Sequence, residues 1–155
     1  MKNLLRNRTF VFSISIMMLL AMFVACGGKT KAEGYADKVE RISKDYTSMM
    51  GEVTKTIEGY VNQSLAKDKA LSEFQEEKEE MGKLSNTFDG LEVPEGLGKV
   101  HLRYKEAISE SLRAMDLLID GTASQNTERL HEGIRVKQEA AEKMIDANEE
   151  LTEQL

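Results

Sequence analysis

Two histidines and one cysteine are the residues best suited to metal or nucleophilic chemistry in this chain of 155 residues. Glu128 and His131 have the Glu-x-x-His spacing that places both side chains on one face of a helix. Di-iron helical bundles use two such pairs and two further glutamates. The residue three positions before His101 is Gly98, so the second pair is missing. The sequence therefore predicts no metal site shared by the two histidines, and we expect both to have structural roles.

The acidic side chains occur mainly in runs, such as Glu76–Glu80 and Glu149–Glu150. A carboxyl pair that performs acid–base catalysis needs an apolar cleft that separates the two pKa values, and no such cleft is predicted. We therefore expect these runs to be solvated. The sequence also has no glycine-rich phosphate loop, zinc-ligand spacing or nucleophile elbow. These observations predict a protein without enzymatic activity and without a cofactor.

The sequence around Cys26, the only cysteine, suggests a different use for its thiol. Three basic residues (Lys2, Arg6 and Arg8) precede an apolar run from Phe10 to Ala25. As a helix this run would be roughly 24 Å long, which is short for a permanent membrane span and typical of a signal peptide. The segment Phe23-Val24-Ala25-Cys26-Gly27 then resembles the lipobox of bacterial lipoproteins, although that family usually has Leu in place of Phe23.

The resemblance implies a lipid anchor. Residues 1–25 would be removed by signal peptidase II, and Cys26 would carry diacylglycerol at the mature N-terminus. Residues 26–34 would form a lipidated tether on the extracytoplasmic side of the cell membrane or outer membrane. Gly27 implies the outer membrane in a Gram-negative host and the outer face of the plasma membrane in a Gram-positive one. The alternatives are an uncleaved anchor helix and a secretory signal with an incidental cysteine.

The composition limits the partners of the mature chain. Without residues 1–25 it has 18 basic and 27 acidic side chains, a net charge of −9. This charge argues against nucleic acids and against adhesion to anionic lipid headgroups. Attraction to the membrane must therefore come from the lipid. The mature chain has no tryptophan, so we expect an aliphatic core in which methionines fill gaps.

Apolar residues recur every three or four positions, which predicts an all-α domain over residues 35–155. We expect helices over 35–65, 69–88, 95–120 and 126–155, with Asn126 as an N-cap and Gly121 as a C-cap. Short connections favour an antiparallel up-down four-helix bundle. No Gly or Pro marks the turn predicted at 64–69, so the alternative is an elongated three-helix bundle in which the first two helices are continuous.

Two functional hypotheses follow. The first is a lipid-anchored, non-enzymatic envelope protein whose helical bundle is presented to another protein or to the cell wall. The second is a carrier that binds a small molecule or a metal in the bundle core, with His131, Glu128, Tyr104 and Met115 as the candidate ligands.

Overall fold

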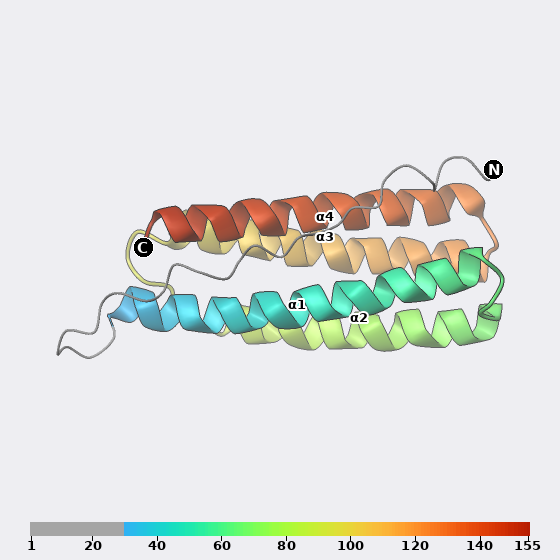
Figure 1. Ribbon diagram of the computed structural model, residues 1–155, viewed down its shortest axis with the longest axis horizontal. Helices are drawn as coiled ribbons and strands as arrows, with labels where there is room; N and C mark the ends of the chain where they lie inside the picture. Colours follow the sequence, from blue (N-terminus) through green and yellow to red (C-terminus); the bar gives the residue numbers. More distant parts are fainter. Residues whose placement is uncertain (1–29) are drawn as a thin grey trace.

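The computed structural model describes residues 30–155, which form four antiparallel helices joined by short loops (Figure 1). In chain order they are α1 (Lys31–Val61), α2 (Lys67–Asp89), α3 (Gly98–Ala123) and α4 (Thr127–Glu153). This confirms the all-α, up-down four-helix bundle. The three-helix alternative is wrong, because residues 62–66 separate α1 from α2. The predicted signal peptide and Cys26 lie outside the described residues.

The first helix begins four residues earlier than the predicted start at Tyr35. Thr30 and Glu33 form a capping box: the Thr30 N–H donates to Glu33 Oε2 (2.7 Å), and the Glu33 N–H donates to Thr30 Oγ1 (3.2 Å). This reciprocal pair satisfies two backbone donors that the helix itself cannot satisfy. Residues 31–34, which we expected in the tether, are therefore helical.

The turn between α1 and α2 also comes earlier than predicted. Gln63 adopts a left-handed conformation (φ 60°), and the N–H groups of Ser64 and Leu65 both donate to the Gly59 carbonyl (2.9 Å each). Leu65 thereby folds back over Gly59, where an added Cβ would lie 3.1 Å from the Leu65 Cβ. The absence of a side chain at Gly59, inside helix α1, gives Leu65 the room to fold back in this turn.

The third helix begins at Gly98 and not at Glu95, and the left-handed glycine of the α2–α3 loop is Gly96 (φ 91°). Gly90, which directly follows α2, is not left-handed (φ −79°). The predicted N-cap of α4 is confirmed, because the Asn126 side chain accepts hydrogen bonds from the N–H groups of Glu128 and Arg129 (3.0 and 3.1 Å).

Helices α3 and α4 approach each other closely through two glycines. A Cβ added to Gly121 would lie 2.6 Å from the Leu130 nitrogen, and one added to Gly133 would lie 3.0 Å from the Leu118 nitrogen. The prediction that Gly121 caps α3 is therefore wrong: the helix continues to Ala123, and Gly121 lies where the backbone of α4 passes. Absence of a side chain, and not conformational freedom, is what this position requires.

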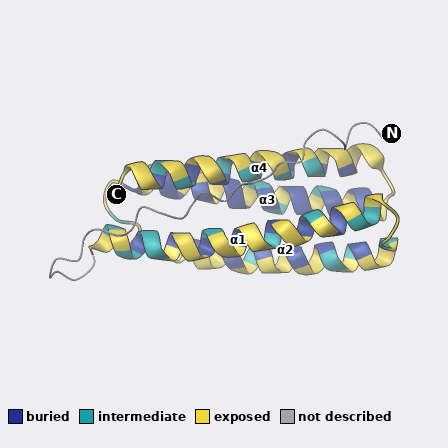
Figure 2. Ribbon diagram, in the orientation of Figure 1, coloured by how far each residue is buried: buried dark blue, intermediate teal, exposed yellow. Residues whose placement is uncertain are grey.

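The core runs the length of the bundle between the four helices, as the inward-facing dark residues of Figure 2 show. Its largest fully buried side chains include Tyr104, Phe74, Phe88, Met81, Ile108, Met115 and Leu118. Methionines fill part of this core, as predicted, but the expectation of an aliphatic core is wrong, because its largest side chains are aromatic. Within residues 30–155, no helix has the unbroken apolar length that crossing a bilayer requires.

The glycine contact gives a direct test of the α3–α4 packing. We expect Gly121→Ala to lower the free energy of unfolding by about 1–3 kcal/mol, because the new methyl group meets the backbone of α4. Gly51→Ala is the matched control, since a Cβ at that exposed helical position meets nothing within 4 Å. This control should raise the free energy of unfolding by up to about 1 kcal/mol. Urea denaturation measures both changes; shifts in the same direction would contradict the packing.

Candidate functional site

The four residues predicted to bind a ligand do not come together. Tyr104 and Met115 are enclosed in the core, whereas Glu128 and His131 are exposed at the start of α4. None of the four lines either of the two grooves described below. Among residues 30–155, no group of three or more His, Cys, Asp or Glu side chains is arranged to hold a metal ion.

His101 is fixed inside the bundle by two aromatic residues. Its Nδ1 shares a hydrogen bond with the Tyr35 hydroxyl (3.0 Å), and its ring stacks on Phe88 with centroids 4.5 Å apart. Burial lowers the pKa of His101 below its usual value of 6.5, and the nearby Lys105 acts in the same direction. The imidazole is therefore neutral at pH 7, and its contacts join α1, α2 and α3.

Further polar contacts join α1 to the α3–α4 pair. The Tyr46 hydroxyl shares a hydrogen bond with Ser111 (2.8 Å). Asn148 Oδ1 accepts hydrogen bonds from Tyr104 (2.8 Å) and Ser43 (3.1 Å). These polar residues within the apolar stripes are therefore used in contacts between helices.

Lys137 makes a similar contact from α4 to α1. Its Nζ donates to Thr54 Oγ1 (2.7 Å), and burial lowers the pKa of its ammonium group. Lys137 lies three residues after Ile134, beside the apolar stripe of α4. The contact with Thr54 accounts for that position.

An acidic groove of about 400 Å³ lies between the C-terminal half of α1 and the N-terminal half of α2. It is lined by Glu52, Lys55, Thr56, Gly59, Ser64, Leu65, Glu73, Glu76, Glu77 and Glu80. Lys55 pairs with Glu52 (2.7 Å), and Lys69, outside the groove, pairs with Glu73 (3.3 Å). The lining thus combines five carboxyl groups with one ammonium group.

Glu77 is the unusual member of the acidic groove, because its side chain is only 8% exposed. Its Oε1 accepts a hydrogen bond from Thr56 (2.9 Å), while its Oε2 is buried and has no hydrogen-bond partner. Burial raises the pKa of Glu77 from 4.5 to about 7; the hydrogen bond from Thr56 opposes this, and neighbouring glutamates, led by Glu73, add to it. Near neutral pH this carboxyl group is therefore divided between its protonated and ionised forms.

The sequence contained a signal for Glu77 that we missed. Glu77 lies three residues after Phe74 and four before Met81, which places it on the buried stripe of α2. We assigned it to a solvated run because its neighbours on both sides are charged. The groove itself depends on the pairing of α1 with α2, which the sequence pattern does not specify in detail.

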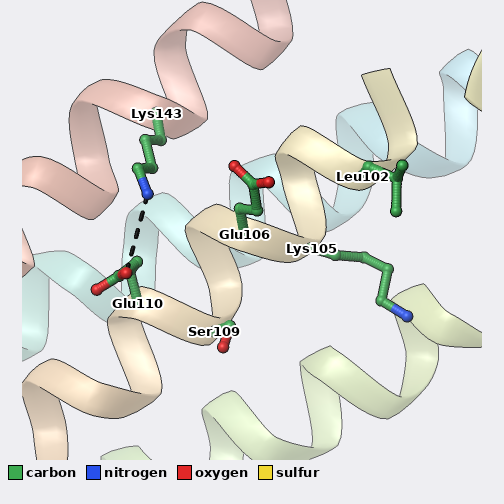
Figure 3. A pocket seen from close by; sticks show the side chains of 6 residues that line it. All are labelled: Leu102, Lys105, Glu106, Ser109, Glu110 and Lys143. Atoms are coloured by element: carbon green, nitrogen blue, oxygen red, sulfur yellow. Dashed lines mark ion pairs between the residues drawn. The ribbon is translucent and has the colours of Figure 1, made fainter. Parts of the chain in front are cut away.

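A second groove, of about 550 Å³, lies over α3 and one residue of α4 (Figure 3). Its lining residues are Leu102, Lys105, Glu106, Ser109, Glu110 and Lys143. Lys143 points towards Glu110, with Nζ 3.9 Å from the carboxylate, and Lys105 extends towards α2, where it pairs with Asp89 (2.7 Å). Two lysines and two glutamates line this groove, so it lacks the excess of negative charge found between α1 and α2.

Comparison of the chain with protein-family models, with curated proteins and with solved structures gave no match. The chemistry of the grooves is therefore argued from their own residues.

The buried carboxyl group predicts how stability depends on pH. Because the folded state raises the pKa of Glu77, its ionisation opposes folding: the penalty is absent below about pH 4.5 and complete above about pH 7. We expect Glu77→Gln to raise the free energy of unfolding at pH 8 by about 2 kcal/mol, and to change it little at pH 5.

Urea denaturation at both pH values measures the effect. Glu149→Gln, at an exposed position of α4, is the matched control and should leave the pH dependence unchanged. A pH dependence that is identical in wild type and Glu77→Gln would contradict the raised pKa.

Proposed function

We propose that the protein is a non-enzymatic, lipid-anchored envelope protein that presents its helical bundle to a protein or cell-wall partner on the extracytoplasmic side. The observation that carries this proposal is the short distance in sequence between the lipobox-like segment and the folded domain. The first helix begins at Lys31, five residues after Cys26, and its N-terminus is fixed by the Thr30–Glu33 capping box.

This spacing limits how far the bundle can lie from the lipid. Five residues span at most about 17 Å, so the start of α1 would remain close to the membrane surface. The α2–α3 loop and the end of α4 lie at the same end of the bundle as the start of α1 (Figure 1). α1 has 31 residues and is therefore about 46 Å long, so the opposite end could extend well beyond the headgroups.

The charge of the mature chain supports anchoring by lipid. A net charge of −9 gives no attraction to an anionic membrane surface. An acylated cysteine supplies the attraction instead, since each buried methylene contributes about 0.8 kcal/mol. Confinement at the membrane raises the effective concentration of the bundle for any partner held in the same layer.

Capture of neighbouring proteins in cells tests this proposal. Amine-reactive cross-linking of the native protein should recover an envelope partner. The control is an exported form without lipid, made by replacing residues 1–25 with a general secretory signal and Cys26 with Ala. We expect recovery of the partner to be lower by about ten-fold or more with the control, because the control lacks the gain in effective concentration that the membrane anchor provides.

The far-UV spectrum and urea midpoint of the control must match those of the native protein, so that a loss of capture reports loss of the anchor. Equal recovery of the same partners by the two forms would contradict the proposed role of the lipid.

A further inference from the structure

We propose that the acidic groove between α1 and α2 binds a linear polyamine, a ligand whose ammonium groups are spaced along an apolar chain. This inference goes beyond the proposed anchoring role and does not depend on it, because the groove consists only of residues in the folded bundle.

The first argument is the charge of the groove. Five carboxyl groups line it and one lysine opposes them. Glu77 is more than nine-tenths buried, and its Oε2 lacks a hydrogen-bond partner. A buried carboxylate is costly unless a cation or hydrogen bonds compensate it. A cation bound against the carboxylates of the groove would offset the negative charge of Glu77 through space.

The second argument is the shape of the groove. Its volume of about 400 Å³ is within the range of small-ligand sites. Glu73, Glu76 and Glu80 follow one another along α2 at intervals of three or four residues, which corresponds to roughly 4.5–6 Å along the helix axis. Gly59 and the Leu65 side chain add apolar surface at the end of the groove next to the α1–α2 turn. Spaced carboxylates that continue into an apolar end of the groove match an extended organic cation.

A compact divalent cation matches this groove less well. Such an ion needs several oxygen ligands within about 2.0–2.6 Å. Among the residues that the structure describes, no three acidic or histidine side chains are close enough together to hold a metal. The carboxylates are distributed along the groove, so a ligand with distributed charge can pair with more of them.

Protonation of Glu77 would be coupled to binding. An ammonium group nearby favours the ionised carboxylate, and therefore lowers the pKa of Glu77 from its value of about 7. Binding near neutral pH should thus be accompanied by net proton release, and affinity should increase from pH 6 to pH 8. The other charged groups that line the groove or act on Glu77 are Glu52 and Lys55 on α1, Glu73, Glu76 and Glu80 on α2, and Lys137 on α4.

Titration calorimetry with spermidine tests the proposal, using the full-length protein in a non-ionic detergent at pH 7. Measurements in two buffers with different ionisation enthalpies give the number of protons released. For wild type we expect saturable binding with a net release of protons, because Glu77 is partly protonated near neutral pH and binding favours its ionised form.

Glu77→Gln should bind spermidine about ten-fold more weakly and release no proton. It keeps the shape of the side chain, and circular dichroism verifies that it is folded. The matched control, Glu149→Gln, should behave as wild type because Glu149 is exposed on α4, outside the groove.

Two further titrations distinguish a polyamine site from diffuse counterion attraction and from a site for a protein partner. Binding of Mg²⁺ as tight as that of spermidine at equal ionic strength would overturn the proposal in favour of diffuse counterion attraction. Binding of trilysine without binding of spermidine would overturn it in favour of a protein partner. Absence of saturable spermidine binding, or equal affinity and proton release in wild type and Glu77→Gln, would also overturn it.

Discussion

The close contact of α3 with α4 is the constraint on which the rest of the bundle depends. At Gly121 and Gly133 the two helices leave no space for even one methyl group without movement of neighbouring atoms. Small residues therefore bring these two helices together, whereas α1 and α2 supply large side chains such as Tyr46 and Phe74 to the remaining core. Close packing of this kind is intolerant of added volume.

Polar contacts also join α1 to the other helices of the bundle. Hydrogen bonds from Ser43 and to Thr54 join α1 to α4, and the Tyr46–Ser111 contact joins it to α3. On its opposite side α1 faces α2 across the acidic groove, where Glu77 is buried beside Thr56. The groove lies about 30–40 Å along α1 from the residue at which that helix begins. If the chain is anchored through Cys26, the groove belongs to the half of the bundle that is farther from the lipid.

The sequence predicted the fold class because four apolar stripes of helical period are a local property of the chain. It predicted the Asn126 cap for the same reason. Its errors occurred where contacts distant in sequence decide the outcome: Gly121 appeared to be a helix end until α4 was seen to pass over it. The prediction of a shared ligand site was wrong for a similar reason. The spacing of residues along the sequence does not show that Tyr104 is enclosed in the core and His131 is exposed. Glu77 was within reach of the periodicity argument, but the surrounding charged run concealed it.

The structure describes the helical bundle, and the sequence suggests a lipid anchor. Cys26 is the residue through which this anchor would be attached to the bundle. Intact-mass spectrometry of the protein isolated from its own membranes measures the state of this residue directly. The account predicts a chain that begins at Cys26 and carries the added mass of diacylglycerol, with or without a further acyl chain. A chain that retains residues 1–25 and has an unmodified thiol at Cys26 would contradict it.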